Sequence, residues 1–272
     1  MLRTVERPAM GSRAVVSADL DARCIAAAHG LIAAAERRWS RFLGDSVVSI
    51  VRAATSPVMV DEATAVILDF AAHGAALTDH WFDPGLRHTG VCLHRQFVAE
   101  SPLLDLGGVA KGWTADLVAD RLVADGATVA LADIGGDVRV RSQRTVLVEC
   151  EAPDQRSQSA IFAVRDAGIA MSGPTRQASH LIDPSSGRPA QARVALVVAR
   201  SAAAAEVLAT AAAVAPLGEA IAFLERVGAA AWLIESNGLV SVTGQPDRFL
   251  IEAGWLAAES TRSWREARCP VS

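Results

Sequence analysis

Apolar residues recur along this chain at the two spacings that distinguish helices from strands. In the segment after Asp21 the spacing is helical, with apolar side chains three or four positions apart at Ile25, Ala28, Ile32, Ala35 and Trp39. Either Asp19 or Asp21 is placed to cap this helix, because an aspartate side chain accepts hydrogen bonds from the first free amides. Further helices are expected over 61–77, from 110 to a stop at Gly126, after a cap at Ser201, and over 217–227.

Short apolar segments bounded by glycine, proline and polar residues predict strands between these helices. They cover 10–17, 91–98, 128–134 with 138–140, 146–149, 161–164, 169–172, 194–199, 229–235 and 239–242. Asn237-Gly238 predicts a hairpin turn between the last two segments. Strands and helices mix without strict alternation, so we expect an α+β fold with mostly antiparallel sheets and packed helices. One domain over 1–245 and a C-terminal tail over 246–272, with helical content around 250–258, complete the prediction.

Composition narrows the classes of protein without identifying one. The chain has 272 residues, of which 51% are hydrophobic, enough for a sizeable core. A net charge of −4 gives no basic surface for nucleic acid or an anionic membrane. Four cysteines without CxxC spacing indicate neither a zinc site nor a disulfide framework. Because no apolar signal segment or membrane-spanning run is present, we expect a cytoplasmic protein in a reducing compartment.

The stretch DLGGVAKGWTAD (105–116) is the strongest candidate for chemistry. It predicts a strand ending at Asp105, a tight turn at Gly107 and Gly108, and a helix from Ala110 onward. Such a junction exposes amides that bind phosphate. Lys111, the only lysine in the chain, could neutralise the charge of a bound phosphate. The alternative is an ordinary strand-to-helix turn with a surface lysine, and this segment alone does not separate the two.

Two further groups of residues each allow both a functional and a purely structural interpretation. His180, in the segment SHLIDPSSGRPA (179–190), could be a general base, although an isolated loop histidine is more often bonded to backbone. Asp183 is better explained as a turn former. Glu206 and Thr210 lie four positions apart on one face of an alanine-rich helix. Their oxygens could ligate Mg²⁺, or Glu206 could simply face solvent.

Aromatic residues in two loops form a last candidate. Phe42 follows the first helix, and Trp81-Phe82-Asp83-Pro84 follows the second. Loop aromatics can stack on flat rings such as adenine or isoalloxazine, but more often they close the core, and the core interpretation is favoured for Trp81 taken singly.

Taken together and in order, these segments resemble the FAD:protein FMN transferase (ApbE) family. The matching segments are Met10-Gly11-Ser12, WSRF (39–42) with Asp45-Ser46, Phe82-Asp83-Pro84, DLGGVAKGWTAD, IGGDVRV (134–140), Ser172-Gly173, SHLIDPSSGRPA and EVLAT (206–210). They extend over roughly residues 8–243, and several motifs in a fixed order make coincidence improbable.

The resemblance implies a flavin-handling enzyme that binds FAD and Mg²⁺. Members transfer FMN to a Ser or Thr hydroxyl of a target protein and release AMP. The FAD contacts would come from Met10, Phe42, Trp81, Phe82, Asp83, Asp105 and Lys111. The Mg²⁺ ligands would be the Gly108 carbonyl, Glu206 and Thr210, and His180 would be the base that activates the acceptor hydroxyl.

The sequence departs from the family pattern at several positions. Glu206 stands where the family usually has aspartate, Gly85 stands where it has threonine, and the chain contains no tyrosine. The segment between Gly85 and Asp105 is also short for the family. Two alternatives therefore stay open: an FAD pyrophosphatase that yields FMN and AMP, and an FAD-binding protein with impaired catalysis.

Overall fold

Nine antiparallel strands form the main sheet in the part of the chain that the computed structural model describes, residues 2–85, 91–92, 97–98, 103–151, 159–174 and 181–257. Along the sheet the order is β1-β2-β6-β7-β8-β11-β12-β13, and β14 pairs with β8. The strands are β1 (Arg3–Ala9), β2 (Ser12–Ala18), β6 (Val129–Ile134), β7 (Asp137–Cys150), β8 (Ala160–Ser172), β11 (Val194–Ala199), β12 (Ala230–Ile234), β13 (Val240–Thr243) and β14 (Leu250–Glu252). Two small sheets consist of β3 (Val58–Met59), β5 (Phe97–Val98) and β4 (Val91–Cys92), and of β9 (Ile182–Asp183) and β10 (Arg188–Pro189).

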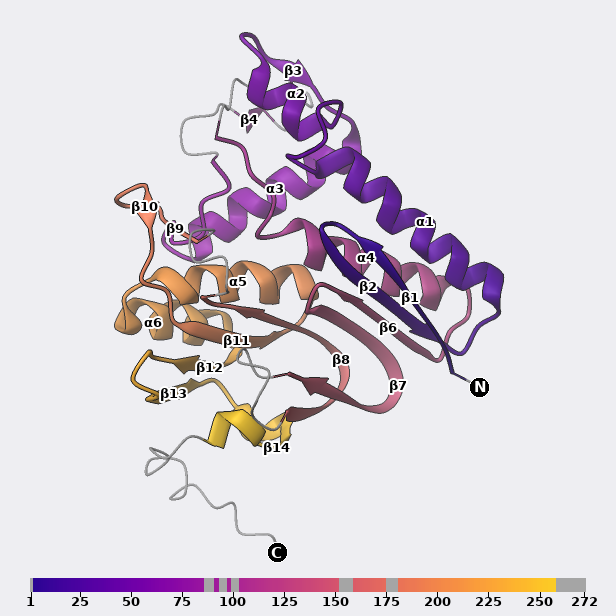
Figure 1. Ribbon diagram of the computed structural model, residues 1–272, viewed down its shortest axis with the longest axis vertical. Helices are drawn as coiled ribbons and strands as arrows, with labels where there is room; N and C mark the ends of the chain where they lie inside the picture. Colours follow the sequence, from indigo (N-terminus) through magenta and orange to yellow (C-terminus); the bar gives the residue numbers. More distant parts are fainter. Residues whose placement is uncertain are drawn as a thin grey trace, which may run out of the picture.

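Helices cover one face of this sheet in two levels (Figure 1). They are α1 (Ala22–Trp39), α2 (Val47–Ala53), α3 (Glu62–Leu77), α4 (Ala110–Ala124), α5 (Ala202–Val214) and α6 (Leu217–Val227), with the short 3-10 helices η2 (Pro246–Arg248) and η3 (Gly254–Ala257). The helices α4 and α5 lie along the sheet, while α1 and α3 lie over them. None of the described helices has the length and apolar character needed to cross a membrane.

The central helix α5 is buried almost all round, as its composition requires. Ten of its 13 residues are buried, and it packs against β8, β11 and α4. It crosses α4 at Gly112, where an added Cβ would lie 2.4 Å from the carbonyl oxygen of Ala202. Only glycine permits this approach, which places the start of α4 against the face of α5 that carries Glu206.

Most of the predicted helices are confirmed with their caps. The five apolar positions of α1 are buried, and the Asp21 carboxylate accepts hydrogen bonds from the amides of Arg23 and Cys24. Ser201 caps α5, and α6 has the predicted bounds. Asp19 has a different role, because its carboxylate accepts hydrogen bonds from the amides of Thr128 and Val129, at the start of β6.

At the N-terminus the strand prediction is wrong in position. The expected strand over 10–17 begins at Ser12, and Met10 and Gly11 form the turn of a β1–β2 hairpin with φ of 52° and 70°. The strand β1 escapes prediction because five of its seven residues are exposed, so it lacks an apolar face. The short helix α2 is also unpredicted, although Ser46 caps it by accepting from the Ser49 amide (3.0 Å).

Two other regions differ from the prediction. Segments 138–140 and 146–149 belong to the single strand β7, and 161–164 and 169–172 to β8, because a shift in register after Arg141 accommodates polar residues. Near the C-terminus, Leu250–Glu252 is strand β14 rather than helix, and Leu256 in η3 is buried in the core. The boundary between a domain over 1–245 and a tail over 246–272 stays a prediction, since 258–272 lie outside the described residues.

Candidate functional site

The glycine turn lies at the start of α4, next to α5. The expected strand ending at Asp105 is wrong: residues 103–109 form turns and irregular backbone. The Asp105 amide donates to the carbonyl of Pro84 (3.0 Å), in the preceding loop, instead of to a neighbouring strand. The junction from turn to helix is confirmed, because α4 begins at Ala110.

Asp105 and Phe42, both predicted to contact FAD, lie on neighbouring loops. The Asp105 carboxylate accepts a hydrogen bond from the Gly107 amide (2.8 Å) and lies 3.3 Å from Nε of Arg41. The Arg41 guanidinium in turn lies over the ring of Phe42, 4.5 Å from its centroid. The Phe42 side chain is 81% exposed and therefore offers an open aromatic face beside the turn.

Lys111 is partly exposed but is held by two buried carboxylates, so it is not a free surface lysine. Its Nζ donates to Oε1 of Glu206 (2.8 Å) and to the carboxylate of Asp137. Burial lowers the pKa of Lys111, but the two carboxylates outweigh burial and raise it, so the ammonium stays charged. Burial raises the pKa of Glu206, as does the charge of Asp137, and Lys111 opposes both effects.

Glu206 faces α4 and not solvent. It is 2% exposed, so the solvent-facing alternative is wrong, and its second oxygen accepts a hydrogen bond from the Gly112 amide (2.9 Å). Both carboxylate oxygens are therefore engaged by the first turns of α4. Thr210 lies one turn further along α5, where its hydroxyl is 3.3 Å from the hydroxyl of Ser172 and beside Gly108.

The three predicted metal ligands share the α4–α5 interface, where both oxygens of Glu206 already accept hydrogen bonds. The contacts pair Glu206 with Gly112 and Thr210 with Gly108. Glu206 and Thr210 lie four positions apart on α5, about 6 Å along the helix axis. Mg²⁺ requires oxygen ligands at about 2.0–2.1 Å in near-octahedral geometry. Within the described ranges no group of three or more His, Cys, Asp and Glu side chains could hold a metal ion.

Two hairpin turns lie beside Lys111. The Gly135 amide, in the turn between β6 and β7, donates to the carbonyl of Arg13 (2.9 Å), just after the Met10–Gly11 turn. The position of an added Cβ on Gly135 is 3.5 Å from Cδ of Lys111. The partly buried Met10, a predicted FAD contact, thus belongs to the neighbourhood of the lysine.

The aromatic loop is drawn largely into the core. Phe82 is 3% exposed and packs under Gly108, where an added Cβ would lie 3.1 Å from its ring. Trp81 is partly buried, and its Nε1 donates to Oε2 of Glu219 on α6 (2.6 Å). Oδ1 of Asp83 accepts from the Gly85 amide (2.9 Å). Phe82 therefore lies in the core, whereas Trp81, for which the core interpretation is favoured, packs against the core while only partly buried.

The predicted base cannot be placed, because His180 lies outside the described residues. The neighbouring Asp183 is described, and its carboxylate accepts hydrogen bonds from the Ser185 amide (2.8 Å) and the Ser186 hydroxyl (2.8 Å). The turn-forming role predicted for Asp183 is confirmed. The same hydrogen bonds lower its pKa.

Two aspartates of the site have no role in the sequence analysis. Asp137 is 3% exposed and pairs with Lys111, and Asp116 accepts hydrogen bonds from the amides of Ala202 and Ala203 (both 2.9 Å). Asp116 thereby fixes the start of α5 and, through it, the position of Glu206. Each aspartate lies within a quoted motif, IGGDVRV or DLGGVAKGWTAD, and that position is the signal that could have identified it.

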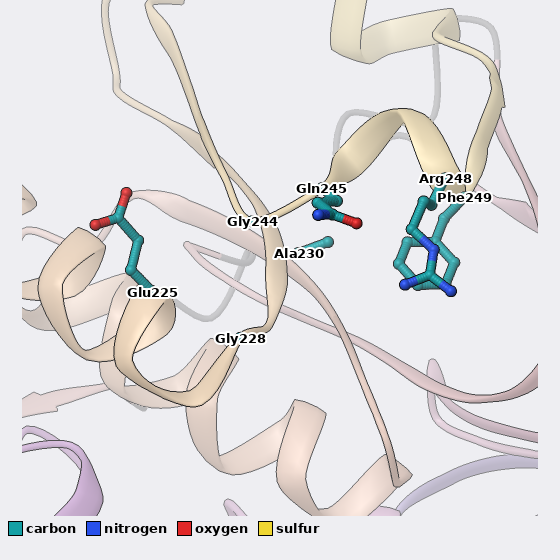
Figure 2. Close-up of a pocket in the computed structure, with 7 residues that line it drawn as sticks. All are labelled: Glu225, Gly228, Ala230, Gly244, Gln245, Arg248 and Phe249. Carbon is teal, nitrogen blue, oxygen red and sulfur yellow. The ribbon is translucent and has the colours of Figure 1, made fainter.

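A surface pocket of about 500 Å³ lies elsewhere, at the C-terminal end of α6 (Figure 2). Its lining residues are Glu225, Gly228, Ala230, Gly244, Gln245, Arg248 and Phe249. None of the predicted site residues is among them. We therefore assign the candidate site to the α4–α5 interface and the loops around it.

Comparisons with known proteins agree with the motifs. The model of the ApbE family matches residues 90–233. A FAD:protein FMN transferase of Vibrio cholerae is 36% identical over 108 residues, which is 35% of this chain and 32% of the relative. The alignment thus spans about a third of that relative's length.

Solved structures share the fold at low sequence identity. The apo flavinyl transferase ApbE of Pseudomonas stutzeri is 23% identical, with a TM-score of 0.76, over 89% of this chain and 94% of its own. The flavin transferase ApbE of Vibrio cholerae is 22% identical, with a TM-score of 0.81, over 92% and 99%. The ApbE protein of Thermotoga maritima is 21% identical, with a TM-score of 0.82, over 93% and 100%. The predicted α+β fold is confirmed.

Proposed function

This chain belongs to the ApbE family, and we propose that it transfers FMN from FAD to a Ser or Thr hydroxyl of a target protein, releasing AMP. The observation that carries the proposal is the charged Lys111 beside the glycine turn of α4, within the residues that match the family. Transfer at a pyrophosphate depends mostly on positioning and charge neutralisation. A lysine that keeps its charge next to a helix N-terminus is suited to both.

The proposed FAD site combines the residues that surround this turn. Asp105 and Lys111 form one wall, with Phe42 exposed on the adjacent loop. Met10 and the loop Trp81-Phe82-Asp83 complete the set. We expect the open ring of Phe42 to contact a flat part of FAD, while the buried Phe82 supports the turn from below.

The proposed reaction is a single displacement at phosphorus. The acceptor hydroxyl oxygen attacks the phosphorus of the FMN half, and the bond from that phosphorus to the bridging oxygen breaks. AMP leaves with the bridging oxygen, and the hydroxyl proton passes to a base, for which His180 is the candidate. The products are a phosphoester-linked flavin on the protein and free AMP.

The family resemblance extends the proposal to Mg²⁺, which would neutralise charge on the pyrophosphate. The candidate ligands are Gly108, Glu206 and Thr210, and both oxygens of Glu206 accept hydrogen bonds from Lys111 and Gly112 in the structure. No step of the reaction above is therefore assigned to a metal. Comparing transfer in MgCl2 with transfer in EDTA tests this part of the proposal separately.

Product analysis distinguishes the proposed activity from its alternatives. The protein is incubated with FAD and MgCl2, with and without a protein substrate of the Vibrio cholerae transferase, and the nucleotides are separated. A transferase releases AMP only when the acceptor is present, and no free FMN accumulates. Free FMN and AMP without acceptor would instead identify a pyrophosphatase, and FAD binding without turnover an impaired enzyme.

A further inference from the structure

The loop of residues 79–85 has an unusual backbone next to the site. Asp79 and His80 are successive non-glycine residues with positive φ, 51° and 65°. This left-handed region is unfavourable for residues with a Cβ, although Asp and His enter it more often than most. Such a conformation persists only where surrounding contacts determine it, so the contacts of this loop are informative.

Part of the support comes from the end of α3. The His80 amide donates to the carbonyl of Ala75 (2.7 Å), and the Trp81 amide to that of Thr78 (2.9 Å). The buried Thr78 hydroxyl accepts from the Phe82 amide (3.2 Å) and donates to the carbonyl of Gly74 (2.8 Å). These bonds fix the first half of the loop relative to α3.

The remaining support comes from α6, which follows in the chain more than 130 residues later. Oε2 of Glu219 accepts a hydrogen bond from Nε1 of Trp81 (2.6 Å). Nη2 of Arg226 donates to the carbonyl of Leu77 (2.6 Å) and to Oδ2 of Asp79 (3.0 Å). An exposed ion pair alone stabilises little, but here one guanidinium joins the end of α3 to the first left-handed residue.

The two side chains of α6 act from one face of a well-anchored helix. Seven positions separate Glu219 from Arg226, which places them about 20° apart around the helix axis. The adjacent face is buried through Ala220, Phe223 and Leu224. The helix is therefore a fixed support against which the loop is held at two points.

The far end of the same loop contacts the candidate site. Phe82 packs under Gly108, and the carbonyl of Pro84 accepts from the Asp105 amide (3.0 Å). A displacement of the loop would therefore move the backbone that leads into Lys111. This connection joins α6 to the proposed FAD site, although no residue of α6 belongs to the family motifs.

We propose that Glu219 and Arg226 are positioning residues, which hold the 79–85 loop so that Phe82 and Pro84 fix the Asp105–Lys111 turn for FAD. The inference rests on the proposed function for the identity of the ligand. The statement that α6 holds the loop does not depend on the proposed function, because it concerns the protein without FAD.

The test compares Glu219→Ala and Arg226→Ala with two control variants. Glu219→Gln keeps an acceptor for Trp81, and Glu225→Ala removes an exposed charge of α6 that lines the pocket in Figure 2. Hydrogen exchange at the amides of His80, Trp81 and Phe82 is measured without FAD. The KM for FAD and the kcat of transfer are then measured for each variant.

We expect hydrogen exchange at these amides to be about tenfold faster or more in both alanine variants. In these variants the loop can open without first breaking its hydrogen bonds to α6. We expect the KM for FAD to rise roughly 5–10-fold while kcat stays within about twofold, because FAD binding must then order a site that is no longer preorganised. Both controls should resemble the wild type.

Unchanged exchange in the alanine variants would overturn the proposal. Faster exchange in the alanine variants with an unchanged KM for FAD would also overturn it, provided that the wild type turns over FAD. If the wild type does not bind FAD, the proposed function fails, and the exchange rates alone decide whether α6 holds the loop.

Discussion

Lys111 has a structural role in addition to its proposed contact with FAD. Its ammonium lies between the carboxylates of Glu206 and Asp137, whose side chains are 3% and 4% exposed. Without the lysine, two buried acids would face each other without a counter-ion, which is among the most destabilising changes in a protein interior.

We therefore predict that Lys111→Met lowers the free energy of unfolding by about 3 kcal/mol, as expected for a broken buried ion pair. Urea denaturation followed by tryptophan fluorescence measures the change. Arg144→Met is the matched control, since it removes an exposed cation from β7 and should change stability by less than about 0.5 kcal/mol. A Lys111→Met protein as stable as the wild type would show that the buried cluster does not depend on the lysine.

Gly85 explains one departure from the family pattern. Its φ is 78°, and an added Cβ would lie 2.2 Å from the carbonyl oxygen of Leu103. Leu103 lies directly against Gly85, so a threonine here has no room.

We predict that Gly85→Thr, which restores the usual family residue, destabilises the protein by about 3 kcal/mol or more through strain and overpacking. The control is Gly30→Ala in α1, where an added Cβ meets open space; it should stabilise by about 0.5–1 kcal/mol. Melting temperatures of both variants provide the comparison. A Gly85→Thr protein with unchanged stability would contradict the packing described here.

Individual site residues differ in how far the sequence could identify them. Lys111 and Asp105 were identifiable because a rare lysine and a glycine turn are visible in the sequence itself. The partners of Glu206 were not, because i,i+4 spacing with Thr210 indicates a shared helix face but not where the carboxylate points. That direction depends on the crossing of α4 and α5 at Gly112, which is a tertiary feature.

At the scale of elements, the contact between α1 and the β1–β2 hairpin includes a buried histidine. His29 is 5% exposed, and its Nε2 lies 3.2 Å from the carbonyl oxygen of Val5. A carbonyl can only accept, so Nε2 carries the proton in this contact. Burial lowers the pKa of His29, and the charge of Arg7 lowers it further.

This shift predicts a loss of stability in mild acid. The unfolded chain binds a proton at His29 below about pH 6.5, whereas the folded protein binds it only at lower pH, so stability falls as the pH decreases through that window. The wild type should therefore lose more stability than His29→Gln between about pH 8 and pH 5.5 in urea denaturation. An equal loss in both proteins would show that His29 does not titrate differently on folding.

The elements themselves were predictable where local signals are strong. The helices α1, α3, α5 and α6 combine a cap or a Gly stop with apolar periodicity or an apolar run, and the structure contains all four. The strand β1 was not predictable, because an exposed edge strand carries no apolar alternation. The expected strand ending at Asp105 failed for a different reason: Leu104 is buried in the core although, among the described residues, this segment pairs with no strand.

At the scale of the whole molecule, the α+β class follows from the mixture of elements, but the order of the sheet does not. The long strands β7 and β8 pair on either side of a register shift, and β14 returns to β8 from the end of the chain. Such distant pairing has no local signature. This sheet supports α4 and α5 side by side and so brings Lys111, Asp137 and Glu206 together from three separate motifs.

The central claim is that this assembly serves the transfer of FMN from FAD to a protein hydroxyl. Its most direct test is the intact mass of a purified acceptor protein after incubation with the wild-type enzyme, FAD and MgCl2, with His180→Ala run in parallel. We predict that the acceptor gains one covalent FMN on a Ser or Thr with wild-type enzyme and none with His180→Ala. An acceptor of unchanged mass, with a folded wild-type enzyme that binds FAD, would contradict the account.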